Sequence, residues 1–129
     1  VAPWKAKADL PGWPIENFVG LDLDRALLEK LPRNLGVHFE THNALSAPFP
    51  MKKPIWIISN PPYGERLGVG GTVKDFAQKL SESLGLYSPE LVALVVPRSW
   101  PALKIPGLKQ VRSHEFSNGG LSVEARIFL

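Results

Sequence analysis

The sequence contains no cysteine, which excludes disulfide bonds, thiolate metal sites and cysteine nucleophiles. It also lacks a long apolar run. The two longest, residues 55–58 and 91–97, are far too short to cross a bilayer, and no signal-peptide pattern precedes them. The excess of basic residues is small, with fifteen Lys and Arg against twelve Asp and Glu, so charge alone does not indicate a nucleic-acid partner. These absences predict a cytoplasmic, intracellular protein that has no membrane partner.

The three histidines do not have the spacing of a metal site. His38 and His42 are four residues apart, but this pair spans an expected strand and the loop after it, and not one face of a helix. His114 lies far along the chain. We therefore expect no metal ligands.

The composition is that of one ordinary globular domain, with 129 residues of which 44% are hydrophobic. Residues 1–16 hold three prolines and two tryptophans with little periodicity, so we expect an irregular lead-in there and one domain over 17–129. Because the first residue is Val1 and not Met, we expect that a longer protein was cut or is only partly represented.

Hydrophobic periodicity predicts an α/β fold. Apolar runs predict strands at residues 17–23, 37–40, 55–58 and 91–96, and helical spacing predicts helices at 25–31 and 72–84, with Asp24 and Thr72 as N-caps. Residues 111–116 and 121–129 alternate like paired strands around the turn sequence Ser117-Asn118-Gly119-Gly120. We expect a three-layer, mostly parallel sheet that ends in an antiparallel hairpin with a reversed edge strand.

The expected strand at 55–58 ends at an unusual polar tetrapeptide. The run is apolar at every position, as a strand buried on both faces requires, so we place Trp56 in the core. Two prolines then prevent strand or helix from continuing through Asn60-Pro61-Pro62-Tyr63. The loop therefore falls just beyond the carboxyl end of a parallel strand, where such sheets bind ligands.

The residue types in this loop suit the binding of a planar amine. The side-chain oxygen of Asn60 and the carbonyl of Pro61, held rigidly by Pro62, can accept the two amine hydrogens and orient the nitrogen lone pair. Tyr63 can stack on the base, which then has to be flipped out or single-stranded. The structural alternative is a proline-rich turn around a buried aromatic ring.

The run Ile57-Ile58-Ser59-Asn60-Pro61-Pro62-Tyr63-Gly64-Glu65-Arg66-Leu67-Gly68 resembles the motif of class I S-adenosylmethionine-dependent amino-methyltransferases. The continuation Gly64-Glu65-Arg66-Leu67 is more typical of the guanine-N2 RNA methyltransferases than of the adenine-N6 or glutamine-N5 enzymes. The terminal Phe116-Ser117-Asn118-Gly119-Gly120-Leu121 is similar to the final hairpin of that guanine-N2 group. The resemblance implies a Rossmann-like fold and S-adenosylmethionine as cofactor.

The resemblance also assigns roles upstream and downstream of the loop. Asp22, in a segment similar to the second motif of the family, would receive the ribose hydroxyls of the cofactor. Asn43 lies where the family usually has an aspartate near the adenine, and Asn60 would also border the cofactor. Glu65 and Arg66 would position the substrate, although a solvated ion pair on a lid is an equal alternative.

One motif of the family is missing. Its strand and glycine-rich loop before the Asp22 segment have no counterpart in residues 1–16, so the expected fold lacks its first strand and half of its cofactor site. Residues 68–72, Gly-Val-Gly-Gly-Thr, follow a polar loop and not a buried strand, which favours a lid over a displaced version of that motif.

The resemblance therefore implies methyl transfer to an exocyclic amine of an RNA base, with guanine N2 of rRNA or tRNA preferred. One alternative is a non-catalytic remnant that serves a larger RNA-protein assembly, with the absent amino-terminal part or other subunits as partners. The other alternative is an adenine-N6 or protein glutamine-N5 methyltransferase. Four basic residues on expected loops could follow an RNA backbone or simply be surface: Lys52, Lys53, Arg98 and Lys104.

Overall fold

A computed structural model describes residues 18–31, 37–63 and 71–129 of the chain. The expected lead-in at 1–16 therefore lies outside the described residues. The chain divides into two compact units, Val1–Asn43 and Ala44–Leu129, and we describe each by itself. In the part of the chain that the structure describes, no helix is long and apolar enough to cross a membrane.

The first unit contains β1 (Val19–Asp22), α2 (Arg25–Glu29) and β2 (His38–Thr41). The two strands pair in parallel, which confirms the predicted α/β character of this segment. Gly20 makes room for the neighbouring strand, because a Cβ atom there would lie 2.3 Å from a ring carbon of Phe39 and would force that ring to shift. Asp24 caps α2, as predicted, by accepting a hydrogen bond from the N–H of Leu27 at 3.2 Å.

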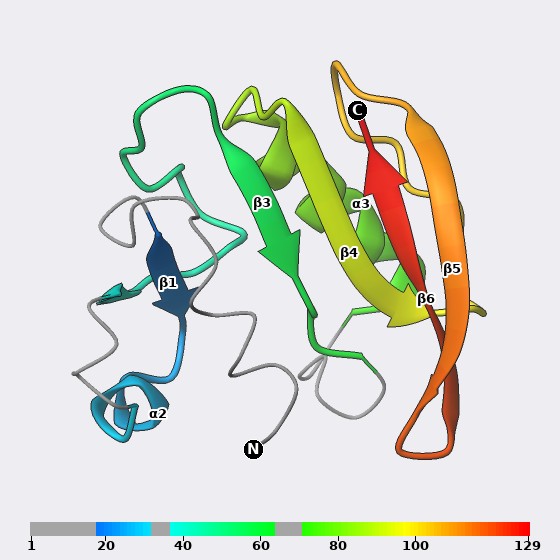
Figure 1. The fold of residues 1–129 in the computed structure, drawn as a ribbon, viewed down its shortest axis with the longest axis horizontal. Coiled ribbons are helices and arrows are strands. Elements are labelled where there is room, and N and C mark those ends of the chain that lie inside the picture. Colours follow the sequence, from blue (N-terminus) through cyan, green and yellow to red (C-terminus); the bar gives the residue numbers. More distant parts are fainter. Residues whose placement is uncertain (1–17, 32–36, 64–70) are drawn as a thin grey trace, which may run out of the picture. The chain divides into compact units, whose positions relative to one another are not determined.

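The second unit is built on a four-stranded sheet of β3 (Trp56–Ser59), β4 (Leu91–Pro97), β5 (Gln110–Asn118) and β6 (Leu121–Phe128). The strand order is β3-β4-β6-β5, as Figure 1 shows. β3 and β4 are parallel, and β6 runs antiparallel to both of its neighbours. The predicted hairpin is confirmed.

The prediction of a reversed strand at the edge of the sheet is wrong. β6, which runs opposite to β4, lies inside the sheet, and β5 forms the edge. The burial of side chains explains this order, because Val123 and Phe128 of β6 are buried whereas every residue of β5 is exposed. The more apolar strand of the hairpin thus takes the interior position.

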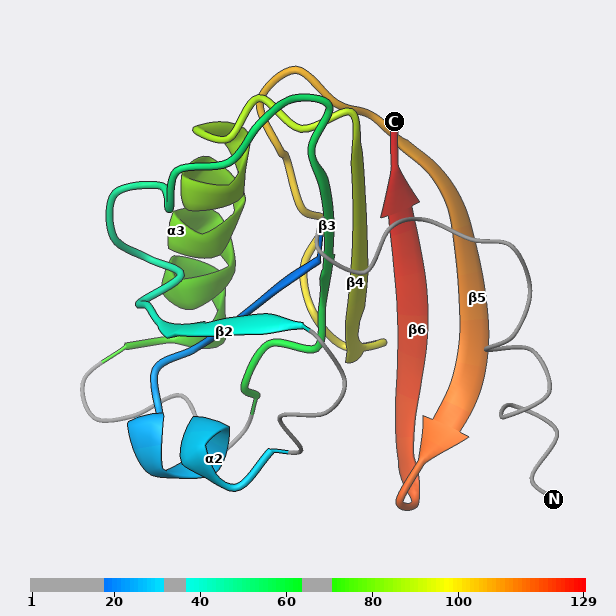
Figure 2. The same ribbon diagram turned by 60° about the vertical axis from the view of Figure 1, so that its left-hand side comes forward.

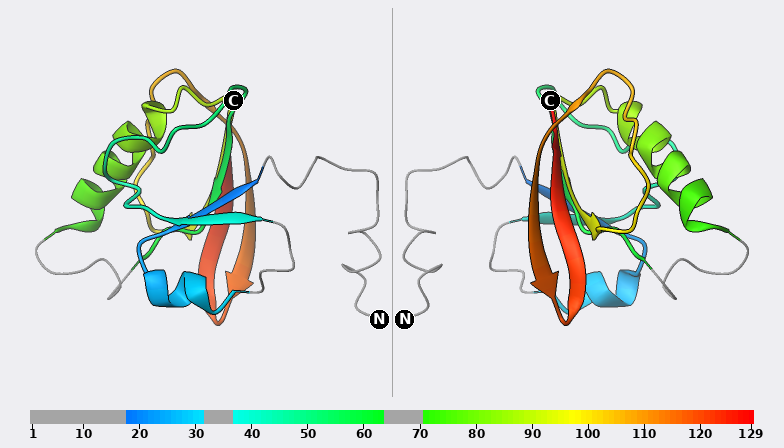
Figure 3. Two further views of the ribbon diagram at one scale, coloured as in Figure 1. Left: turned by 90° about the vertical axis from the view of Figure 1, so that its left-hand side faces the viewer. Right: turned by 90° about the vertical axis from the view of Figure 1, so that its right-hand side faces the viewer.

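Helix α3 (Val73–Gly85) covers one face of this sheet (Figures 2 and 3). It begins as predicted at Thr72, whose hydroxyl accepts a hydrogen bond from the N–H of Asp75 at 3.1 Å. Apolar side chains spaced three and four residues apart on α3 face the sheet and build the core with β4, β6 and the segment that follows β4. The buried members of this core are Ala77, Leu80, Leu84, Val92, Leu94, Val96, Trp100, Leu103, Ile105 and Phe128.

The prediction that residues 55–58 are buried on both faces is wrong, and so is the core position of Trp56. Ile55 is buried and Ile57 packs against the core, but Trp56 is 48% exposed and Ile58 is 78% exposed. Successive side chains of a strand point to opposite faces, and the core lies on the face that carries Ile57. The Trp56 and Ile58 side chains therefore lie on the face of β3 opposite the core.

Candidate active site

The acceptor loop, which we define as residues 60–63, begins where β3 ends. Asn60 is exposed, Pro61 is buried, Pro62 is exposed and Tyr63 is half-buried. Because β3 and β4 are parallel, their carboxyl ends lie at the same edge of the sheet. The structure thus places the amide of Asn60 in solvent at that edge, with a buried proline directly behind it.

Tyr63 is held at two points. Its ring packs against the buried core formed by α3, β4 and β6. Its hydroxyl oxygen accepts a hydrogen bond from Nδ2 of Asn118, with 3.5 Å between nitrogen and oxygen. The ring is therefore partly held against the core, as the structural alternative predicts, and partly accessible, as stacking on a base requires.

Asn118 is a residue of this site that the sequence analysis missed. It closes the β5–β6 turn opposite Leu121, and the two following glycines have positive φ values, +58° at Gly119 and +83° at Gly120. The Asn-Gly-Gly sequence predicted this turn, and the structure confirms it. Nothing in the sequence, however, indicated that the turn reaches a residue 55 positions earlier.

The substrate-side residues Glu65 and Arg66 lie outside the described residues, as does most of the glycine-containing segment 68–72. Their assigned roles stay predictions. Arg98, one of the candidate phosphate contacts, forms an ion pair with Glu115 of β5 at 3.0 Å, and both side chains are about half exposed. Lys52, Lys53 and Lys104 are exposed.

In the first unit, the structure brings Asp22 and Asn43 to one edge of the β1–β2 pair. Asp22 is the last residue of β1, and its backbone carbonyl accepts a hydrogen bond from the N–H of His42 at 2.8 Å. Asn43 follows directly and is exposed. The two predicted cofactor residues therefore share the carboxyl edge of two parallel strands, which is where such sheets bind ligands.

The carboxylate of Asp22 suits the recognition of hydroxyl groups. Its Oδ1 atom accepts a hydrogen bond from the backbone N–H of Asp24 at 2.8 Å, which fixes the side chain at the end of β1. Among the described residues, no donor occupies its Oδ2 atom. A carboxylate that is oriented by the backbone and keeps acceptor capacity fits the ribose hydroxyls of a nucleoside cofactor.

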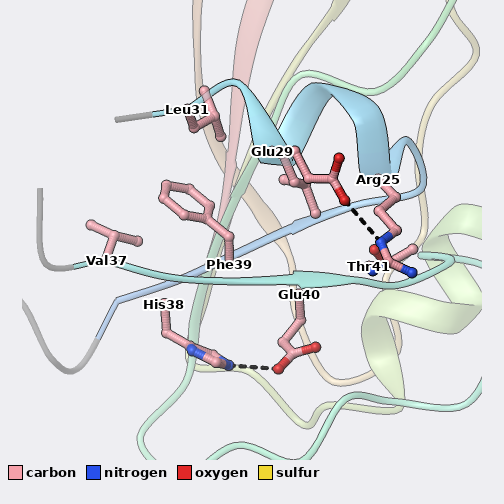
Figure 4. Close-up of a pocket in the computed structure, with 9 residues that line it drawn as sticks. Arg25, Glu29, Leu31, Val37, His38, Phe39, Glu40 and Thr41 are labelled. Atoms are coloured by element: carbon pink, nitrogen blue, oxygen red, sulfur yellow. Dashed lines mark hydrogen bonds and ion pairs between the residues drawn. The ribbon is translucent and has the colours of Figure 1, made fainter. Parts of the chain in front are cut away.

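A shallow hollow of the first unit lies beside α2 and β2 (Figure 4). Its polar side chains pair with one another: Arg25 forms an ion pair with Glu29 at 3.1 Å, and Nε2 of His38 lies 2.8 Å from Oε1 of Glu40. Neither Asp22 nor Asn43 lines it. The hollow is therefore no evidence for a cofactor site away from the ends of β1 and β2.

Within residues 18–31, 37–63 and 71–129, no group of three or more His, Asp or Glu side chains is arranged to hold a metal ion. The candidate site residues that the structure describes are an amide, two prolines and a tyrosine in the second unit, and a carboxylate and an amide in the first. Each of these two groups of side chains can bind and orient polar groups.

The family model of the RMKL-like methyltransferase domain matches residues 2–124, which is nearly the whole chain. The chain belongs to this family. A 69-residue stretch of this methyltransferase domain is 41% identical to the ribosomal RNA large subunit methyltransferase K/L of Hydrogenovibrio crunogenus. That stretch is 54% of the domain and 9% of the relative, so the domain matches only a small part of the longer protein. No solved structure matches.

Proposed function

We propose that this methyltransferase domain transfers a methyl group to the exocyclic amine of an RNA base, with guanine N2 of ribosomal RNA as the acceptor. The observation that carries the proposal is the exposed amide of Asn60 at the carboxyl end of β3, in a chain of the RMKL-like methyltransferase family. The relative named for methylation of large-subunit ribosomal RNA supports the choice of substrate.

The acceptor loop would orient the amine. The Oδ1 atom of Asn60 and the backbone carbonyl of Pro61 would each accept one amine hydrogen, which aligns the nitrogen lone pair for attack. The burial of Pro61 supports this role, since it fixes the backbone on which Asn60 stands. Pro62 adds a second restricted φ angle, so little loop entropy is lost when the base binds.

Tyr63 would stack on the base. Its ring is half-buried against the core and would offer its accessible side to one base at a time. A base inside a duplex cannot reach such a ring, so the target has to be flipped out or single-stranded. Glu65 and Arg66, three residues or fewer after Tyr63, would contact the same nucleotide or its phosphate.

S-adenosylmethionine, when bound, would supply the methyl group: the N–C bond forms as the S–C bond of the sulfonium breaks, a neutral thioether leaves, and the amine loses one proton to water, so no metal is needed. Asp22 would bind the ribose hydroxyls, Asn43 would contact the adenine, and Asn60 would border the cofactor as well as the amine. The proposal includes a Rossmann-like class I methyltransferase fold, which the parallel pairs β1–β2 and β3–β4 support.

A methylation assay tests the proposal. The protein is incubated with methyl-labelled S-adenosylmethionine and unmodified ribosomal RNA, transfer RNA, DNA or a glutamine-containing peptide, and the labelled nucleosides or residues are identified. We expect N2-methylguanosine from ribosomal RNA. Label in transfer RNA alone, in adenine or in peptide would overturn the proposed acceptor.

Calorimetry with S-adenosylmethionine separates an enzyme from a non-catalytic remnant. Micromolar binding that disappears in Asp22→Ala is the expected result. A protein that binds no cofactor even at millimolar concentration and methylates none of the four substrates would instead be a structural member of an RNA-protein assembly.

A further inference from the structure

The turn between β5 and β6 reaches back to the acceptor loop. Nδ2 of Asn118 lies 3.5 Å from the hydroxyl oxygen of Tyr63, and this hydrogen bond joins the end of the hairpin to the loop after β3. Both residues belong to the second unit, Ala44–Leu129. The hairpin thus contributes a side chain at the carboxyl ends of β3 and β4, where Asn60 also lies.

The backbone fixes where the Asn118 side chain stands. β6 pairs with β4 from Phe128 through Val123, so the hairpin continues directly from the same sheet that contains β3. The N–H of Arg98 donates to the carbonyl of Ser122 at 3.1 Å, which ties the segment after β4 to the start of β6, next to the turn. The ladder then closes with Asn118 opposite Leu121. A tight turn on a paired ladder leaves its first residue little freedom.

The contact holds only the outer end of Tyr63. The inner part of the ring packs against the buried core, so loss of the hydrogen bond would leave the ring attached but free to tilt. A stacking platform that tilts binds a planar base less well without any loss of the fold. The structure therefore separates the orientation of Tyr63, which depends on Asn118, from the stability of the domain, which depends on the core.

We propose that Asn118 is a positioning residue, which sets the orientation of the Tyr63 ring for the acceptor base. The role rests on the proposed function, because it takes Tyr63 as the ring on which the base stacks. Asn118 itself touches neither the amine nor the cofactor in this assignment. Its removal should weaken binding of the acceptor RNA and leave cofactor binding unchanged.

The first test observes the contact without any activity. The chain has only two tyrosines, so ¹³C labelling of tyrosine rings gives two sets of NMR signals, which Tyr63→Phe and Tyr87→Phe assign. In Asn118→Ala we expect the Tyr63 ring signals to shift and those of Tyr87 to stay. Ser117→Ala, an exposed change one residue earlier on β5, is the matched control and should move neither. Unchanged Tyr63 signals in Asn118→Ala would overturn the proposal.

The second test measures steady-state methylation of guanine-containing RNA. A single hydrogen bond corresponds to about a 2- to 10-fold change in an equilibrium constant, so Asn118→Ala should raise KM for the RNA by about that factor. KM for S-adenosylmethionine should not change. In a Tyr63→Phe background, which lacks the accepting hydroxyl, Asn118→Ala should add no further rise.

The outcomes are distinguishable from failure of the proposed function. If the Tyr63 signals shift but KM for RNA is unchanged, Asn118 orients the ring for no catalytic purpose and the proposal is wrong. If the additional rise persists in the Tyr63→Phe background, Asn118 acts by another route and the proposal is also wrong. If no RNA is methylated by the unsubstituted protein, the proposed function fails first, and the role of Asn118 fails with it even where the NMR contact is present.

Discussion

Neighbouring residues of the acceptor loop have opposite surroundings. Asn60 is exposed and Pro61 is buried, although both belong to the same turn after β3. Replacing Asn60 by a smaller residue therefore removes an exposed amide and disturbs no packing. Replacing Pro61 in the same way leaves a space in the interior. At the scale of single residues, this contrast allows chemistry to be tested apart from folding.

Replacement of Asn60 by Ala should lower the rate of methyl transfer without destabilising the domain. Loss of one oriented hydrogen-bonding group in an active site can cost about 10²-fold or more in rate, which single-turnover methylation would detect. The free energy of unfolding should change by less than about 0.5 kcal/mol, because the side chain is exposed.

Gln78→Ala is the control for this change, since it removes an exposed side-chain amide from α3 at a site with no assigned role. It should leave the methylation rate as it is. A fully active Asn60→Ala protein would contradict the assignment of Asn60 to the amine.

Asp22, the last residue of β1, and Asp24, the cap of α2, should respond differently to substitution. Asp22→Asn weakens a hydroxyl acceptor, so we expect a higher dissociation constant for S-adenosylmethionine by calorimetry. Asp24→Ala removes the N-cap of α2, which typically lowers stability by about 0.5–2 kcal/mol. It should reduce helical content, and it should weaken cofactor binding less than Asp22→Asn does. The opposite ranking of the two variants in cofactor affinity would contradict the role given to Asp22.

At the scale of elements, the sequence predicted what depends on neighbouring residues. The caps Asp24 and Thr72 and the Asn-Gly-Gly turn all follow from local hydrogen bonds and backbone preferences. It did not predict which face of β3 is covered. An apolar run such as 55–58 is the same whether one face or both are buried, because that depends on elements elsewhere in the chain.

The two faces of the sheet should therefore differ in tolerance to mutation. Leu94→Ala, at a fully buried position facing α3, should lower the free energy of unfolding by about 2–5 kcal/mol. Ile58→Thr, at a position that is 78% exposed, should change it by less than about 1 kcal/mol. Urea unfolding followed by circular dichroism measures both. A large loss in Ile58→Thr would show that this side chain is covered in solution.

A buried arginine ties β6 to the segment after β4. The guanidinium of Arg126 is 5% exposed and donates hydrogen bonds to a carboxylate oxygen of Glu124 and to the carbonyls of Pro101 and Trp100. Periodicity could not predict this contact, since the alternation of β6 indicates only which side chains point inward. Burial of an ion is acceptable here because every bonded group is a strong acceptor.

Arg126→Ala should be among the most damaging single changes, because it leaves a carboxylate and two carbonyls without their donor. We expect a loss of about 3–5 kcal/mol in the free energy of unfolding. Arg126→Lys should recover little of it, since an ammonium group cannot reproduce the planar fork of a guanidinium. Full stability in Arg126→Lys would mean that charge alone, and not geometry, holds this segment.

At the scale of the whole molecule, burial is uneven between the two units. No described residue of Val1–Asn43 is fully buried, whereas Ala44–Leu129 contains the whole described core. Native-state hydrogen exchange should therefore show slow amides in β4, β6 and α3 and faster ones in β1 and β2. Equal protection of β1 and β4 would contradict this ranking.

The candidate site shows the same division between what a sequence can and cannot predict. The sequence indicated the acceptor loop because Asn60, Pro61, Pro62 and Tyr63 are consecutive, and it indicated Asp22 because ligand residues often stand at the end of a strand. The sequence could not indicate Asn118 as a site residue. Its contact with Tyr63 joins residues 55 positions apart, and it depends on the order of the strands in the sheet. Sites assembled across a sheet require the fold before their members can be named.

The outer position of β5 has a consequence for how this protein behaves at high concentration. An edge strand offers unpaired backbone groups to any other extended chain, and a long apolar edge promotes aggregation. β5 instead carries Arg112, His114 and Glu115 along its exposed length, and a register shift interrupts its pairing between Gln110 and Arg112. An approaching strand would have to desolvate these polar and charged side chains and match an irregular backbone, so the sheet resists extension on this side.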